Sequence, residues 1–245
     1  MALSSVSRFA ANCFAVVCGC LVATMGWAVG PESVDWRTEG LVTGVKNQGQ
    51  CESSWAFAAI GAVEGAYAKS SGNLVNFSEQ QLIDCDTARN QGCNGGTPSA
   101  ALEYIQQQEW VALEVAYPYS GTKGTCQRVA KSNFPLIKKV VAVSPANERA
   151  LQKVVSVIGP VAARIDASHE SFLNYKNGIY NEPRCSRTRL NWDVLVVGYG
   201  TENGQDYWLV KNSFGTDWGE RGYIKIARNR NNMCGIATQA SYPAM

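Results

Sequence analysis

The chain has 245 residues, of which 46% are hydrophobic, so it can bury a full core as one large domain or as two packed lobes. Its 22 Lys and Arg residues nearly balance 20 Asp and Glu residues, which gives a formal charge of +2. Because there is also no basic run and no acidic tail, composition offers no support for nucleic acid or an anionic membrane as the main partner.

The first 30 residues predict a leader segment. No charged residue occurs in 9–30, and the apolar centre at 13–25 precedes a stretch rich in small residues. This pattern is typical of a secretory signal peptide cleaved near Ala28 or Gly30. An uncleaved membrane anchor is the alternative, since the uncharged run is just long enough to span a bilayer. We favour the signal peptide and expect one domain over 31–245, with no membrane contact once the leader is removed.

Cysteine usage indicates the same compartment. Three of the nine cysteines lie in the leader, and an even set of six remains, which is typical of disulfide bonding outside the cell. Six cysteines allow 15 pairings. A metal site is disfavoured because there is no Cys-x-x-Cys pair and only one histidine. The sequon at Asn76 predicts N-glycosylation. The six cysteines are Cys51, Cys85, Cys93, Cys126, Cys185 and Cys234.

Helix signals dominate the first half after the leader. Residues Ser54 to Lys69 carry apolar side chains at a period near 3.6, and Ser78 with Gln81 forms a capping box for a second helix. The glycine-rich run 92–96 predicts a tight turn before a third helix over Pro98 to Gln108, which has proline in its first turn.

The second half changes to strands. Five segments rich in β-branched and aromatic residues are bounded by Gly, Asn or Pro. A helical lobe followed by a β-rich lobe is an α+β arrangement, and a cleft between lobes is a usual place for a ligand. The predicted strands are Leu136 to Val143, Val161 to Ile165, Val194 to Tyr199, Tyr207 to Val210 and Tyr223 to Ile226.

The segment VKNQGQCESSWAFAA at 45–59 resembles the nucleophile segment of papain-like cysteine peptidases. Three more segments, LVVGYG at 195–200, VKNSFG at 210–215 and DASHESF at 166–172, resemble other marks of that family, and the last is typical of cathepsin-L-type members. The resemblance covers nearly all of 31–245. It implies the two-lobed papain-like fold with an interlobe cleft. Active relatives carry a propeptide, and we expect none here because the domain follows the leader directly.

The resemblance also implies how the six cysteines pair. It selects one of the 15 pairings and leaves no free thiol after leader removal. The implied disulfides are Cys51 with Cys93, Cys85 with Cys126, and Cys185 with Cys234.

Four positions depart from the family pattern, and all belong to the active site. Ser54 stands where the family has the nucleophilic Cys, and Trp192 stands where it has the catalytic His. A hydroxyl depends on a base far more than a thiol does, and an indole N–H is a donor that cannot accept a proton. Glu52 replaces a Gly beside the substrate backbone, and Phe214 replaces a Trp that shields the catalytic pair.

Other family positions persist. Gln48 matches the oxyanion-hole Gln and Asn212 matches the Asn that orients the His, so both are candidate catalytic positions. With Trp192 opposite, we expect them to serve only as hydrogen-bonding groups in the cleft. The single histidine, His169, matches a non-catalytic stretch, and we expect a surface or loop position for it.

Asp193 is rejected as a replacement base, because neighbouring residues of a strand point to opposite faces. It is expected instead to border the S2 pocket of the cleft, near Gln239 at the pocket floor; a simply solvated Asp193 is the alternative. With Glu52 these residues predict a polar or acidic groove that favours basic peptides. Gly95 and Gly96 are the expected contacts for a substrate backbone.

These features predict a secreted, extracellular or endolysosomal homologue that has lost proteolysis. We expect it to act as a monomer that binds peptides, or cystatin-type or propeptide-type inhibitors, without cofactor or metal. The alternative is an active hydrolase of peptide bonds with an atypical centre at Ser54. In serine proteases, loss of triad members leaves a rate about 10³ to 10⁴ times that in water, which is far below useful proteolysis.

Overall fold

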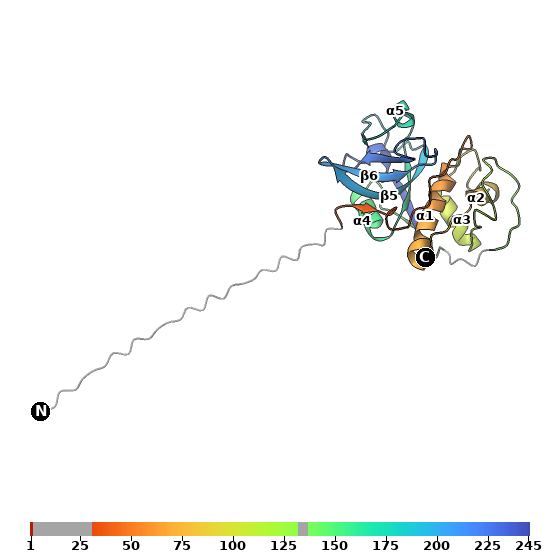
Figure 1. The fold of residues 1–245 in the computed structure, drawn as a ribbon, viewed down its shortest axis with the longest axis horizontal. Helices are drawn as coiled ribbons and strands as arrows, with labels where there is room; N and C mark the ends of the chain where they lie inside the picture. Colours follow the sequence, from red (N-terminus) through yellow and green to blue (C-terminus); the bar gives the residue numbers. More distant parts are fainter. Residues whose placement is uncertain (2–30, 132–136) are drawn as a thin grey trace.

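The computed structural model describes Met1 and residues 31–131 and 137–245. Figure 1 shows a lobe built from helices α1, α2 and α3 beside a lobe built around a sheet that contains β5 and β6. The predicted α+β class, with a helical lobe before a β-rich lobe, is therefore confirmed. The predicted signal peptide lies outside the described residues, as does the start of the strand expected from Leu136.

Helix α1 (Ser54–Ser71) runs along the junction of the two lobes. Its small residues allow close approach: a Cβ at Gly61 would lie 2.7 Å from the Leu195 side chain, and one at Gly65 would lie 2.7 Å from Pro160. The helix ends two residues later than predicted, where Gly72 adopts the left-handed conformation (φ 75°) that favours glycine. The side of α1 with Gly61 and Gly65 therefore packs against the β-rich lobe, whereas Trp55 and Ala59 lie in the core of the helical lobe.

The other two helices of this lobe begin where their capping residues predict. Helix α2 (Glu79–Cys85) starts after Ser78, whose hydroxyl accepts a hydrogen bond of 3.0 Å from the Gln81 backbone N–H. Helix α3 (Pro98–Gln108) has the predicted bounds, and the Thr97 hydroxyl caps it. The three disulfides also pair as the resemblance implies: Cys51–Cys93, Cys85–Cys126 and Cys185–Cys234.

One sheet organises the second lobe, in the order β2-β8-β3-β5-β6-β7-β4, and β1 pairs with β5 outside this path. The pairs are antiparallel except β4 with β7. Strand β3 has the predicted bounds, whereas β5, β6 and β7 extend beyond theirs, and α4, α5, β1, β4 and β8 were not predicted. The strands are β1 (Val34–Asp35), β2 (Lys139–Ala142), β3 (Val161–Ile165), β4 (Ile179–Tyr180), β5 (Trp192–Glu202), β6 (Gln205–Lys211), β7 (Tyr223–Ala227) and β8 (Gln239–Ala244). The helices of this lobe are α4 (Glu148–Val157) and α5 (Glu170–Leu173).

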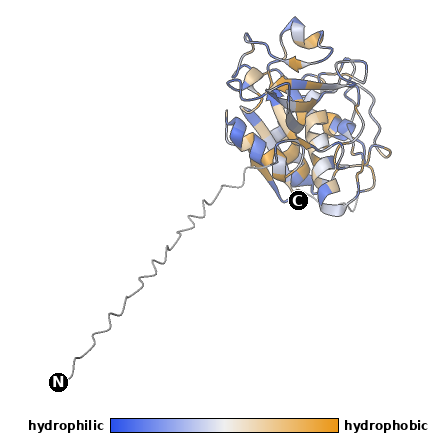
Figure 2. Ribbon diagram, turned by 60° about the vertical axis from the view of Figure 1, so that its left-hand side comes forward, coloured by the Kyte–Doolittle hydropathy of each residue, from blue (hydrophilic) through white to orange (hydrophobic). Residues whose placement is uncertain are grey.

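Apolar side chains form a core in each lobe and a third cluster between the lobes. In the third cluster, Ala58 and Ala62 of α1 lie among side chains of β3, β5 and β6, including Leu195. Figure 2 shows apolar positions concentrated on the central strands and on the helix beside them. Among residues 31–131 and 137–245, no helix has the length and hydropathy needed to cross a bilayer.

A substitution at Gly198 tests the close contact between β1 and β5. A Cβ at Gly198 would lie 2.0 Å from the Val34 carbonyl oxygen, so Gly198→Ala must push the two strands apart. We expect a loss of about 1–3 kcal/mol in unfolding free energy, measured by urea denaturation. The control is Gly44→Ala, because a Cβ at Gly44 meets nothing within 4 Å. Equal effects of the two substitutions would contradict the proposed contact.

Candidate functional site

Ser54 is the first residue of α1 and lies at the junction of the lobes. Its backbone N–H is among the helix N-terminal groups that have no intrahelical partner, and the positive end of the helix dipole lies there. The hydroxyl is 5% exposed. It lies within 3.5 Å of the Asp193 Oδ2 atom, to which it donates, and it accepts a hydrogen bond of 3.3 Å from the Asp193 backbone N–H.

The alternative of a simply solvated Asp193 is wrong, and strand alternation does not keep its carboxylate away from Ser54. Asp193 is 3% exposed and its carboxylate approaches the hydroxyl directly. The alternation along β5 does hold, since Trp192 and Asp193 contact different partners. However, α1 begins beside the backbone of Asp193 itself, so the carboxylate reaches Ser54 without crossing the strand.

Burial raises the pKa of Asp193 from 3.8 to about 7, although the positive charge of Arg164 and the Ser54 hydroxyl both act to lower it. Arg164 is the cross-strand neighbour of Asp193 in the ladder of β3 and β5. Its Nε atom lies 3.7 Å from Asp193 Oδ1, beyond hydrogen-bond distance, and within the described part of the chain Oδ1 has no hydrogen-bond partner. Near neutral pH the carboxyl is therefore populated in both protonation states.

Trp192 turns toward Asn212. Its indole N–H donates a hydrogen bond of 2.9 Å to Asn212 Oδ1, and its ring lies 4.8 Å from that of Phe214, centroid to centroid. Asn212 Oδ1 also accepts from the Ser213 backbone N–H. Trp192 thus occupies the acceptor oxygen of the Asn212 amide, and an indole offers Ser54 no acceptor nitrogen.

Gln48 is buried and held by its neighbours. Its Nε2 atom donates to the Cys51 carbonyl at 2.7 Å, and its Oε1 atom accepts from the Ser213 hydroxyl at 2.6 Å. One of the two amide protons of Gln48 is therefore engaged. Gln48 and Asn212 both make hydrogen bonds to neighbouring residues.

An open groove of about 540 Å³ contains the Ser54 site. Glu52 is exposed at its edge, and a backbone bridge joins Glu52 to Asn94. Gly96 must lack a side chain, because a Cβ there would lie 2.4 Å from Asn90 Oδ1. The lining residues are Glu52, Ser54, Trp55, Asn94, Gly95, Gly96, Arg164, Leu190, Asn191, Trp192 and Asp193.

One predicted site residue, Gln239, and the single histidine lie outside this groove. Gln239 does not line this groove; it lines a second pocket on the other side of Arg164, because β8 is separated from β5 by β3. His169 is in the turn that begins α5, where its Nε2 atom lies 3.7 Å from Asp166 Oδ2. Cys185 is nearby, but its sulfur is in a disulfide, so these three residues do not form a metal site.

Arg164 was not predicted as a site residue. It lines both the groove and the second pocket, and its Nη1 atom donates a hydrogen bond of 2.8 Å to the Gly96 carbonyl. The sequence does carry a signal, because Arg164 interrupts the apolar strand Val161–Ile165. A cation in a buried strand usually has a specific partner.

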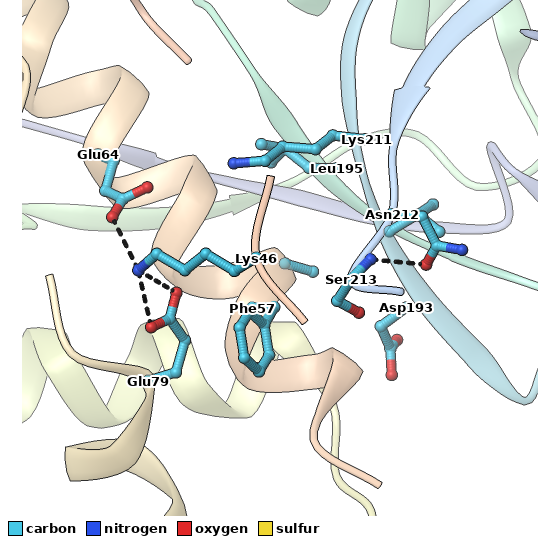
Figure 3. Close-up of a pocket in the computed structure, with 11 residues that line it drawn as sticks. Lys46, Phe57, Glu64, Glu79, Asp193, Leu195, Lys211, Asn212 and Ser213 are labelled. Carbon is cyan, nitrogen blue, oxygen red and sulfur yellow. Dashed lines mark hydrogen bonds and ion pairs between the residues drawn. The ribbon is translucent and has the colours of Figure 1, made fainter. Parts of the chain in front are cut away.

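A cluster of buried charges joins the lobes close to this site. Lys46 Nζ lies 2.8 Å from Glu79 Oε1 and 3.8 Å from Glu64 Oε1 (Figure 3). Although burial lowers the pKa of Lys46, attraction to these carboxylates raises it overall, whereas burial lowers the pKa of Lys211. A cavity of about 20 Å³, with room for one water molecule, separates this cluster from Asp193. This cluster was not among the features predicted from the sequence.

The model of the papain family cysteine proteases matches residues 30–244. The chain is 51% identical over 217 residues to cathepsin L of Sarcophaga peregrina, covering 88% of this chain and 64% of that protein. It is 49% identical over 218 residues to cathepsin L2 of Homo sapiens, covering 87% of this chain and 65% of that protein. The chain therefore spans slightly less than two thirds of the length of these relatives.

Solved structures agree with the sequence matches. A digestive procathepsin L 3 from the larval midgut of Tenebrio molitor superposes with a TM-score of 0.84 at 44% identity, covering 88% of this chain and 70% of that chain. The proform of the ragweed pollen cysteine protease Amb a 11 gives a TM-score of 0.83 at 43% identity, covering 88% of this chain and 66% of that chain.

Substitution of Asp193 by Asn tests the cost of burying this carboxylate. Because the folded-state pKa is raised, the stability contributed by the protonated carboxyl is present below pH 4 and is lost as the pH rises to about 7. Asp193→Asn should therefore match the natural protein at pH 4 and exceed its unfolding free energy at pH 8, by at most about 4 kcal/mol. Urea denaturation at both pH values measures the difference.

The matched control is Asp217→Asn, at an exposed position. It should show no comparable gain between pH 4 and pH 8. A pH-independent effect of Asp193→Asn would contradict the burial of an ionisable carboxylate beside Ser54.

Proposed function

Because this chain belongs to the papain family of cysteine proteases, we propose that it is a member that binds peptides in the Ser54 groove and does not hydrolyse them efficiently. One observation carries the proposal. The indole N–H of Trp192 donates to Asn212, so this pair supplies no proton acceptor to the Ser54 hydroxyl.

The chemistry supports loss of proteolysis. A serine hydroxyl is a weak nucleophile unless a base removes its proton, and the same base must then protonate the leaving amine. Asp193 contacts Ser54, but at 3.5 Å the hydrogen bond is long. Gln48 also has one amide proton engaged with Cys51. Ser54 therefore lacks an efficient base, and one of the two Gln48 amide protons remains as a donor.

The groove remains suited to an extended ligand. It is open, and Asn94 and Glu52 make its edge polar. Because Gly95 and Gly96 have no side chains, a peptide backbone can approach the wall closely there. We propose peptides, or inhibitors of the cystatin or propeptide type, as ligands of a monomer that needs no cofactor. Three disulfides support a secreted, extracellular or endolysosomal location.

A second candidate function is hydrolysis with Asp193 as the base for Ser54. It is favoured by the direct approach of the carboxylate and by the rise of the Asp193 pKa to about 7, because a general base works best near the operating pH. This candidate replaces the sequence-based argument that no acceptor reaches Ser54. It predicts activity that increases as Asp193 ionises.

A fluorogenic dipeptide assay distinguishes the two functions. We expect no turnover by the purified natural protein, and we expect Ser54→Cys/Trp192→His to gain activity because it restores a thiol and an imidazole. Turnover by the natural protein that Ser54→Ala abolishes and Ser70→Ala retains would establish the hydrolase instead. Mass spectrometry for an acyl adduct on Ser54 gives an independent measurement of the same point.

Binding is measured separately, by the fluorescence anisotropy of labelled peptides mixed with the natural protein. We expect saturable binding that an Asn94→Trp substitution reduces about tenfold or more, because Asn94 is exposed and lines the groove, where the new side chain takes up ligand space. The control is Gly44→Ala, outside the groove. Absence of saturable binding to every peptide in a mixed library would contradict the proposal.

A further inference from the structure

A second pocket of about 220 Å³ adjoins the Ser54 groove. It lies between the start of α3 and the strands β3 and β8, and Arg164 separates it from the groove. Of the described residues that line it, Arg164 is the one that carries a charge. The others are small, apolar or neutral polar: Thr97, Pro98, Ser99, Ala142, Val143, Pro145, Ala162, Thr238, Gln239, Ala240 and Ser241.

The Arg164 guanidinium is held in place but not satisfied. Nη1 donates to the Gly96 carbonyl at 2.8 Å, which fixes the plane of the group at the wall of the groove. Among the described residues, Asp193 is the one acidic residue within 4.0 Å of the guanidinium. Its Oδ1 atom lies 3.7 Å from Arg164 Nε, which is too far for a hydrogen bond. The remaining N–H groups of Arg164 are available to a ligand, since a guanidinium carries five.

The exposure of Glu52 and of Arg164 decides which of the two charges governs the selectivity for peptide side chains. Glu52 is exposed, so water and salt screen its attraction for a basic ligand. The side chain of Arg164 is only 20% exposed, so water screens its attraction for a ligand charge much less. The expected preference for basic peptides therefore reverses at this pocket.

We propose that Arg164 selects peptides with an acidic side chain, Glu or Asp, which enters the second pocket while the peptide backbone follows Gly95 and Gly96. The fork of a guanidinium matches the two oxygens of a carboxylate. Gln239 pairs with Arg164 in the ladder of β3 and β8. It lies on the side of Arg164 opposite to Asp193, and it lines the second pocket. The inference rests on the proposed binding function and assigns its specificity.

The test uses four fluorescein-labelled peptides, Ala-Xaa-Ala-Ala with blocked ends, in which Xaa is Glu, Gln, Lys or Leu. Fluorescence anisotropy with the full natural chain should show Glu binding about tenfold more tightly than its uncharged isostere Gln, and Lys binding most weakly. Arg164→Ala should remove the difference between Glu and Gln. Arg164→Lys should keep part of it, because the charge remains but the fork is lost.

Two further variants control for surface charge and folding. Arg187→Ala removes an exposed charge that lines neither pocket and should leave the Glu preference unchanged. Gln239→Glu places a carboxylate beside Arg164 at an exposed position, so it should fold even if Arg164→Ala does not. It should weaken Glu binding and strengthen Lys binding.

The outcomes separate the two proposals. Saturable binding with equal affinity for Glu and Gln overturns the role of Arg164 and leaves peptide binding standing. Retention of the Glu preference in Gln239→Glu also overturns it. No binding of any of the four peptides overturns the Arg164 proposal, and the mixed-library measurement then decides whether peptide binding itself is lost.

Discussion

The site depends on how closely α1 packs against the sheet. A Cβ at Gly61 would lie 2.7 Å from the end of the Leu195 side chain, which would have to shift, and Ala58 and Ala62 pack in the interlobe cluster with Leu195. This packing brings the first turn of α1 against the backbone of Asp193, where Ser54 accepts its N–H. The position of the hydroxyl is thus fixed by backbone approach and does not depend on any catalytic contact.

That constraint has an electrostatic consequence. Side chains at the start of β5 become buried between α1 and the neighbouring strand, and a carboxylate there loses its solvation. Asp193 retains two partial compensations, the Ser54 hydroxyl and the charge of Arg164, and neither makes a short hydrogen bond. The raised pKa follows directly. Buried carboxylates with raised pKa values and few compensating contacts occur most often at functional sites.

The sequence predicted the architecture well because its signals are local. Residues close together in the sequence determine the cap at Ser78, the bounds of β3 and the order of helices before strands. The family resemblance supplied the disulfide pairing. The contact between Asp193 and Ser54 was missed because strand alternation says which face a residue takes, not what covers that face. Arg164 was missed because its role arises from the register of three strands.

The side chains around Ser54 form two separate pairs. The rings of Trp192 and Phe214 contact each other on one side of β5, and the Trp192 indole N–H donates to Asn212, which closes the side where proton transfer would be relayed. Asp193 and Arg164 face each other across the other side and place charge in the groove. Proton transfer needs a base that alternates between two states beside the hydroxyl, whereas recognition needs a fixed charge with free donors. Arg164 meets the second requirement more fully than Asp193 meets the first, because Arg164 is anchored at Gly96 and still has N–H groups to offer. This difference is the reason for proposing selective binding, and not hydrolysis, as the function of the groove.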